Sequence, residues 1–257
     1  MAYGADANDA YRAVVEERFA AYESDPTTTH AGRRYARAVL AGNRAALGDR
    51  TSLDALLAEE RNVARVGNAL MPLSAVRQRE LVLSIRESVA KRDLTNPTVA
   101  CERVHVAAAN GDHAAAVAAA RACLERWPRA RTAVTLLAAE LLFLGQDEEA
   151  LAHARRARRM PGNWAQEDAV AAAAELVGGD RDEAARICER ARRRILSCGY
   201  TTQEYTLLQA SVAALAGDHV ALDAARQVKS LHYDTKSLLW EKLSQRMGEP
   251  TRGTTSS

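Results

Sequence analysis

Apolar residues recur along most of this chain at spacings of three and four, which is the period of helices that bury one face. No segment alternates apolar and polar residues for long enough to predict a β-strand. Prolines and glycines separate the periodic segments, because proline is tolerated at a helix start but interrupts a helix interior. The pattern therefore predicts an all-helical chain. The expected helices span about 8–23, 28–42, 51–70, 72–92, 97–110, 112–127, 130–144, 146–160, 163–178, 180–196, 201–216, 218–229 and 234–247.

The composition supports closely packed helices. Only 5% of the 257 residues are aromatic, and alanine dominates many segments. Small side chains let helices approach each other, whereas a β-sandwich needs β-branched and aromatic residues. With 47% apolar and 26% charged residues, the chain can bury a core. Apolar stretches such as 114–120 are short for a membrane span, and the start of the chain, with Asp6 and Asp9, lacks an apolar leader segment. We therefore expect neither a transmembrane segment nor a secretory signal.

Glycines recur at a fixed interval in the second half of the chain. Gly111, Gly145 and Gly179 are each 34 residues apart, and each lies between two predicted helices. A looser copy begins at Gly217. We expect each glycine to end the first helix of a hairpin in the left-handed conformation. Small residues follow the first three glycines at five, nine and twelve positions, where they would let the second helix pack closely. These are Ala116, Ala120, Cys123, Ala150, Ala154, Ala157, Ala184, Cys188 and Ala191.

This spacing resembles the tetratricopeptide repeat (TPR), a 34-residue helix–turn–helix unit, over residues 97–236. The resemblance implies a TPR-like right-handed α-α superhelix, an α-solenoid of stacked antiparallel helix hairpins. The chain departs from the family in two ways. Ala, Val or Leu replace the large aromatic residues that the family often carries in its first helix, and Leu222 and Arg226 stand where the fourth copy should have small residues. These departures leave the number of repeats open.

The rest of the chain lacks the 34-residue spacing. We expect residues 1–96 to form further helical hairpins that extend or cap the solenoid, with a separate small helical domain as the alternative. Residues 237–247 carry an apolar stripe that includes Leu239 and Leu243, and they predict a capping helix. The polar tail, residues 248–257, is expected to be disordered.

In the TPR family the first helix of each hairpin lines a concave groove, so the resemblance implies a partner-binding surface there. The surface is small and mostly uncharged, which suits an amphipathic helix or an extended apolar peptide. It lacks the basic residues with which related clamp proteins hold a carboxylate tail. In the alternative interpretation, these residues only pack unit on unit, or the last helix covers them. The implied groove residues are Thr98, Cys101, His105, Thr132, Thr135, Ala139, Leu142, Phe143, Gln166, Ala169 and Leu176.

Arginines gather at the ends of two second helices, and stacking would bring them together as a basic strip. They are Arg155, Arg156, Arg158, Arg159, Arg190, Arg192, Arg193 and Arg194. Such a strip suits an acidic protein, an anionic membrane or RNA. However, the same helices begin with acidic residues, an arrangement that the helix dipole favours, and the net charge is only +2. No interleaved aromatic residues offer to stack bases, so nucleic acid is a less favoured partner.

The chain carries no recognised catalytic, cofactor or metal motif. The four cysteines form no C-x-x-C pair, which favours a reduced, cytosolic protein. His113 and His219 each follow a Gly-Asp pair, and we attribute them to repeat structure. Acidic pairs lie at helix starts that we expect to be exposed, where nothing would raise a pKa. We therefore predict no catalytic residues, no metal and no cofactor.

The sequence as a whole predicts a cytoplasmic, non-enzymatic scaffold or adaptor that forms part of a larger complex and binds a protein partner. Residues 101–104 and 124–128 are similar to a repeat-bearing cytosolic subunit of a membrane insertase complex, which implies peripheral association with a membrane-bound complex. A binder of nucleic acid or of an anionic surface is the first alternative. An enzyme with an unrecognised site is the second.

Overall fold

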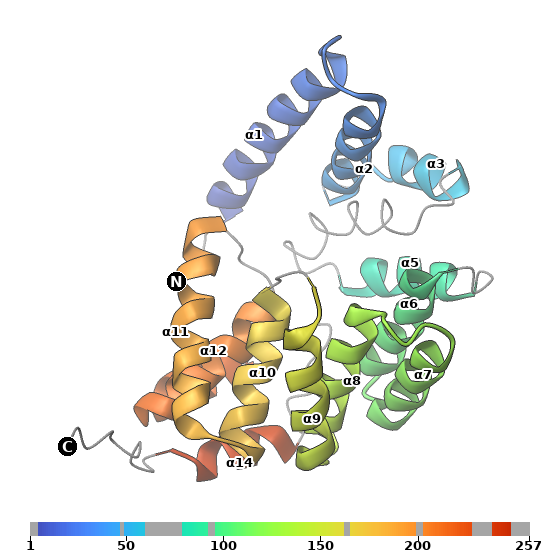
Figure 1. Cartoon of the computed structure of the whole chain (residues 1–257). Coiled ribbons are helices and arrows are strands. Elements are labelled where there is room, and N and C mark those ends of the chain that lie inside the picture. The colour runs from blue at the N-terminus through green and yellow to red at the C-terminus, as the bar shows by residue number, and fades with distance from the viewer. Residues whose placement is uncertain are drawn as a thin grey trace. The chain divides into compact units, whose positions relative to one another are not determined.

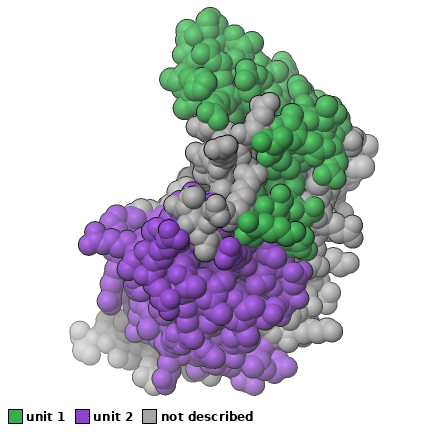
Figure 2. All heavy atoms as spheres, turned by 90° about the vertical axis from the view of Figure 1, so that its right-hand side faces the viewer, with its two compact units in different colours: residues 1–91 green, residues 92–257 purple. Residues whose placement is uncertain are grey.

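The computed structural model describes residues 5–46, 49–59, 79–91, 96–161, 165–198, 203–227 and 238–247. Within these residues every regular element is a helix and no strand occurs, so the predicted all-helical class is confirmed. The chain divides into two compact units, residues 1–91 and 92–257, which Figure 2 shows in two colours. The division lies close to the point where the 34-residue spacing begins. The expected disordered tail, 248–257, lies outside the described residues.

Unit 1 contains helices α1 (Ala5–Ser24), α2 (His30–Ala46), α3 (Thr51–Glu59) and α5 (Arg79–Ala90). α2 packs against both α1 and α3. Ion pairs join Arg44 to Glu16 and Arg37 to Glu23 across α1 and α2, at 2.6 and 2.5 Å. These side chains are partly exposed, so such pairs add little stability beyond the apolar contacts. The second half of the helix expected at 51–70 lies outside the described residues.

Unit 2 forms its described helices within a few residues of the predicted bounds. They are α6 (Pro97–Ala109), α7 (His113–Arg126), α8 (Arg131–Phe143), α9 (Asp147–Arg159), α10 (Ala165–Gly178), α11 (Arg181–Cys198), α12 (Gln203–Ala216), α13 (His219–Gln227) and α14 (Leu238–Gln245). The helices α6 to α13 form four hairpins in chain order, and Figure 1 shows neighbouring helices side by side.

The first and second helices of the hairpins differ in what they contact. Each helix from α6 to α13 packs against the next one in the chain. The first helices also contact each other from hairpin to hairpin, α6 with α8, α8 with α10 and α10 with α12. In the described residues, no equally close backbone approach joins α7 to α9 or α9 to α11. The first helices therefore form a continuous layer within unit 2.

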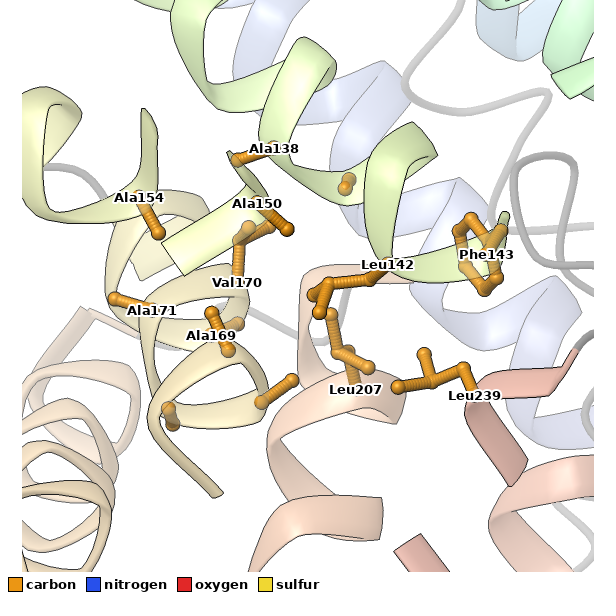
Figure 3. Packing of buried hydrophobic residues seen from close by; sticks show 14 of the residues in the cluster. Ala138, Leu142, Phe143, Ala150, Ala154, Ala169, Val170, Ala171, Leu207 and Leu239 are labelled. Carbon is orange, nitrogen blue, oxygen red and sulfur yellow. The ribbon is translucent and has the colours of Figure 1, made fainter. Parts of the chain in front are cut away.

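The core of unit 2 is built largely from alanine. The nine small residues that follow the glycines at five, nine and twelve positions are all buried, and all except Ala157 belong to one apolar cluster. Figure 3 shows Ala150 and Ala154 of α9 facing Val170 and its neighbours on α10. A methyl side chain lets two helix backbones approach closely. The packing energy then comes from many close contacts between the helices and not from large side chains. The repeating alanines thus set how the hairpins pack.

Three turn glycines end a first helix in the same way. Gly111, Gly145 and Gly217 have φ angles of 75°, 75° and 70°, which is the left-handed region. In each turn the glycine N–H donates to the carbonyl three residues back, and the next N–H donates to the carbonyl five residues back. This is the Schellman arrangement, which satisfies the last carbonyls of a helix and requires a positive φ. The expectation of left-handed turn glycines holds at these three positions.

Gly179 corrects the prediction, because it does not adopt this turn. Its N–H donates to the Glu175 carbonyl at 3.0 Å, as in a continuing helix, and the next N–H, of Asp180, donates to the Glu175 carboxylate at 3.1 Å. A side chain on Gly179 would meet this same carboxylate. The exact 34-residue interval therefore does not identify which glycines are left-handed, because the hydrogen bonds within each turn decide this. Gly217, the looser copy in sequence, is the closer structural equivalent of Gly111 and Gly145.

Candidate functional site

Helix α14 lies across the layer of first helices. It contacts α8, α10 and α12, and also α13, and Figure 1 places it at the lower end of α10. Leu239, Trp240 and Leu243 are buried in this contact. Figure 3 shows Leu239 pointing toward Leu142 of α8 and Leu207 of α12. We call the part of α8, α10 and α12 that α14 covers, together with the turns that follow α8 and α10, the α14 seat.

Lys242 of α14 and Arg246, which directly follows α14, contact the turn after α8 and the C-terminal end of α10. The Lys242 ammonium donates to the Gly145 carbonyl at 3.2 Å and to the Asp147 carboxylate. The Arg246 guanidinium donates to the Val177 carbonyl at 2.9 Å. The last carbonyls of a helix carry the negative end of its dipole, so a cation placed there is favourable.

A third cation, from outside α14, completes the row. Arg181, the first residue of α11, donates to the Leu215 carbonyl at the end of α12 at 2.9 Å. It also donates to the carbonyl of Arg246, just after α14, at 2.7 Å. The ends of three successive first helices therefore each receive one cation, of which Lys242 belongs to α14 and Arg246 directly follows it.

The sequence-predicted groove residues lie on the first helices, but most of them belong to the core. Cys101, Thr135, Ala139, Leu142, Phe143, Ala169 and Leu176 are buried. Thr98 and Thr132 are exposed in the first turns of α6 and α8, and His105 is partly buried. The side chain of Gln166 lies outside the description. The buried positions are part of the core, and Leu239 of α14 points toward one of them, Leu142 (Figure 3).

Most of the predicted arginine strip is engaged in ion pairs with acids of α10 and α11. Arg155 holds the Glu175 carboxylate with two hydrogen bonds of 2.7 and 2.8 Å. Arg158 pairs with Glu183 at 3.0 Å, and Arg190 pairs with Asp168 at 3.2 Å. Arg155 and Arg158 join neighbouring hairpins, whereas Arg190 joins the two helices of one hairpin, so these three arginines are not a free basic surface.

The remaining arginines of the strip are more exposed. Arg156 donates to the Pro128 carbonyl, and both Arg192 and Arg193 pair with Glu189 on their own helix. Arg159 has no polar partner among the described residues, and the side chain of Arg194 lies outside them. A cavity of about 430 Å³ opens here between α9, α10 and α11. Its lining holds four arginines and three acids: Arg155, Arg158, Arg159, Arg186, Glu175, Asp180 and Glu183.

Buried acidic residues are the feature that the sequence analysis missed. Glu140 and Glu175 on the first helices and Glu167 and Asp168 in the first turn of α10 are all buried, which corrects the expectation that the acidic pairs lie exposed. Arg131 pairs with Glu167 at 2.6 Å. For Glu167, Asp168 and Glu175 the signal available in sequence is an arginine in the preceding hairpin, but many exposed pairs share it.

Glu140 and His113 form a buried polar pair. The His113 Nδ1 lies 2.7 Å from a carboxylate oxygen of Glu140, and the His113 ring stacks on Phe143 at 5.0 Å. Burial raises the pKa of Glu140, and the contact with His113 partly opposes that rise. His219, which follows Gly217 as His113 follows Gly111, is exposed instead. Only one of the two turn histidines therefore has a role inside the core.

The thiols of Cys101 and Cys123 lie in hydrogen-bonding contact across α6 and α7. The Cys101 thiol donates to Cys123, which lowers the pKa of Cys123 and, together with burial, raises that of Cys101. Burial, aided by the Asp168 carboxylate, raises the pKa of Cys188 to about 12. All three are free cysteines.

Comparisons of this chain with protein-family models, with curated proteins and with solved structures each find no match. Among the described residues, no three His, Cys, Asp or Glu side chains gather in a way that could hold a metal ion. None of the described helices combines the length and apolar character that crossing a membrane requires.

Proposed function

We propose that this chain is a cytoplasmic, non-enzymatic TPR-like scaffold, part of a larger complex, that binds a helix of a protein partner against its layer of first helices. One observation carries this proposal. The chain's own α14 packs an apolar stripe onto α8, α10 and α12, so this layer accepts an amphipathic helix. The contact of first helix with first helix supports a curved stack whose inner layer is α6, α8, α10 and α12.

The layer of first helices is suited to binding a partner helix without catalysing a reaction. Its surface combines leucine and alanine side chains with helix-end carbonyls, and both kinds of group bind a helix through packing and hydrogen bonds. Rigid neighbouring hairpins hold these groups in place, so little ordering accompanies binding.

The anionic-partner alternative has weaker support. Arg155, Arg158 and Arg190 are neutralised by partly or fully buried acids. The nearby cavity balances four arginines with three acids. An electrostatic binder would lose orders of magnitude in affinity between about 50 and 200 mM salt, which would distinguish it from a helix scaffold.

The scaffold proposal is tested with the full chain carrying Leu239→Asp, which weakens the hold of α14. The probe is a labelled synthetic peptide of residues 234–249, and its fluorescence anisotropy is followed during titration. We expect saturable binding to the variant and at least about tenfold weaker binding to the unchanged chain, in which α14 competes. A peptide with Asp at the positions of Leu239 and Leu243 is the control. Absence of binding by a variant that keeps its helical circular dichroism would reject the proposal.

A further inference from the structure

The ends of the first helices share a property that sets the chemistry of the α14 seat. α6, α8, α10 and α12 have no basic residue in their last turn. Of the second helices, α7, α9 and α13 do have basic residues there, and α11 has none. Basic residues at a helix end compensate its dipole. The C-terminal ends of the first helices therefore carry the negative end of the helix dipole, with no basic residue of the same helix beside it. Asp147 adds a carboxylate beside the end of α8.

α14 supplies the missing cations in a regular register. Lys242 and Arg246 are four residues apart, and so are Leu239 and Leu243. Arg246 directly follows α14, but its N–H donates to the Lys242 carbonyl at 3.1 Å, as in a continuing helix. Residues four apart lie on one face of a helix, so each pair forms a short stripe. Each cation comes three residues after a buried leucine. The α14 seat thus selects a pattern of an apolar residue followed three positions later by Lys or Arg, given twice.

Gly145 allows the close approach on which this register depends. A Cβ atom at this position would lie 3.2 Å from both the Leu238 side chain and the Lys242 ammonium. The glycine is left-handed to end α8, and it also leaves room for the incoming helix. The same residue therefore ends α8 and forms part of the seat.

From this complementarity, and resting on the proposed function, we infer that the α14 seat recognises a cationic amphipathic helix of a protein partner, and that the partner helix displaces α14. The partner helix carries the two apolar residues and the two cations in the register of α14. Its cations occupy the ends of α8 and α10, and its apolar stripe replaces Leu239 and Leu243 in the core.

α14 is suited to act as a resident competitor. It is eight residues long, whereas an isolated helix in water needs roughly 12–15 residues even for marginal stability. Ten residues, 228–237, separate it from α13 in the same chain, so α14 competes for the seat as an intramolecular ligand. A partner helix that binds the seat weakly therefore does not displace α14, whereas a longer helix with the same register does.

The test compares two labelled 16-residue peptides on the full chain by fluorescence anisotropy. Both have the α14 apolar register on an alanine-rich background. One carries Lys and Arg at the two cationic positions, and the other carries Gln there. We expect the cationic peptide to bind about tenfold more tightly. In the Asp147→Asn chain this ratio should fall several-fold, and the neutral peptide should gain affinity because α14 loses the ion pair of Lys242 with Asp147. The Lys242→Gln chain, whose α14 competes less, should bind the cationic peptide more tightly than the unchanged chain.

Each other outcome has a distinct meaning. Equal affinity of both peptides overturns the charge requirement but leaves the scaffold proposal standing. Failure of both peptides, and of the 234–249 peptide, to bind a folded Leu239→Asp chain overturns the inference and the scaffold proposal together. If light scattering shows two-chain particles that the 234–249 peptide dissociates, α14 exchanges between copies, and a second copy replaces the partner as the occupant.

Discussion

Glu140 shows how burial changes what a single residue does. In sequence it is one acid among many, but in the structure it is only 2% exposed and contacts His113. A carboxylate in such a place is costly unless it is hydrogen-bonded or protonated, so the histidine and the raised pKa have the same origin. Glu175 is equally buried, but two hydrogen bonds from Arg155 compensate its charge.

Replacing His113 with alanine should destabilise the chain most at neutral pH. The change leaves the buried Glu140 carboxylate without this hydrogen bond, at a cost of about 1–3 kcal/mol. Because the pKa of Glu140 is raised in the folded state, protonation of its carboxyl group stabilises the fold. This stabilisation is complete below the pKa of the unfolded chain and is lost as the pH rises. The difference in free energy of unfolding between the His113→Ala chain and the unchanged chain should therefore become smaller toward pH 5. Urea denaturation at pH 7.5 and pH 5 measures it, with His219→Ala as the exposed control. A loss that does not depend on pH would contradict this account.

Cys188 should resist alkylation in the folded chain. With its pKa raised to about 12 by burial, almost no thiolate is present at pH 8. We expect iodoacetamide to leave Cys188 unmodified in buffer at pH 8 and to modify it fully in urea, as read by mass spectrometry of peptides. Rapid labelling without urea would show that the environment of α11 is more open than described.

Helix ends and helix seams decide the structure of each element. Asp112 and Asp218 follow a left-handed glycine, and each accepts a hydrogen bond from the N–H three residues on, at 2.9 Å. A Gly-Asp pair thus ends one helix and caps the next. At the third hairpin the Glu175 carboxylate replaces the left-handed glycine, and Asp180 still caps α11. Elements with different turns therefore still form equivalent hairpins.

Replacing Gly111 with alanine should cost about 1–2 kcal/mol, because an L side chain is strained at a φ of 75°. No described atom lies within 4 Å of the added Cβ, so the cost comes from the backbone alone. Gly111→Asn should cost less, since asparagine tolerates this conformation. Thermal unfolding of the two variants gives the comparison. Equal losses for alanine and asparagine would count against a conformational cause.

Replacing Ala150 with tryptophan should cost on the order of 1–3 kcal/mol by overpacking the seam between α8, α9 and α10. Ala150 is fully buried, whereas Ala152 on the same helix is exposed. Ala152→Trp is therefore the matched control and should leave the melting temperature within a degree or two, since exposed substitutions are usually within about 0.5 kcal/mol. Similar melting temperatures for the two variants would contradict the alanine seam.

At the scale of the whole molecule, α14 ties hairpins that are distant in the chain. The bond of its Lys242 to Gly145 and that of Arg246, just after it, to Val177 span 97 and 69 residues. Nearly all other unit 2 packing joins neighbouring hairpins, which leaves a repeat stack loosely coupled over distance. α14 therefore adds cooperativity to unit 2, and its release would loosen three hairpins together.

Leu243→Ala should destabilise unit 2 by about 2–5 kcal/mol, as expected for a fully buried leucine. Hydrogen exchange followed by mass spectrometry should become faster in α8, α10 and α12 and stay unchanged in unit 1. Leu238→Ala, at a side chain that is 49% exposed, is the control and should change little. Faster exchange that spreads through α1 and α2 as well would show that the two units unfold together.

The sequence alone predicted the helices, because periodicity and helix-ending residues act within a few neighbouring positions. The bounds of α6 to α14 and the burial of Ala116, Ala150 and Ala184 follow from such local signals. Local sequence signals did not predict which of the turn glycines adopt the left-handed conformation. The sequence favours Gly179 over Gly217, but a carboxylate from one turn earlier decides the conformation at Gly179.

Tertiary structure decided where the candidate site lies. Leu142 and Phe143 are apolar on any prediction, and only the packing of α14 and the neighbouring helices makes them core. The pairing of Lys242 with the end of α8 joins residues almost a hundred positions apart. A sequence pattern records which face of a helix is apolar, but the partner of that face depends on how the hairpins stack.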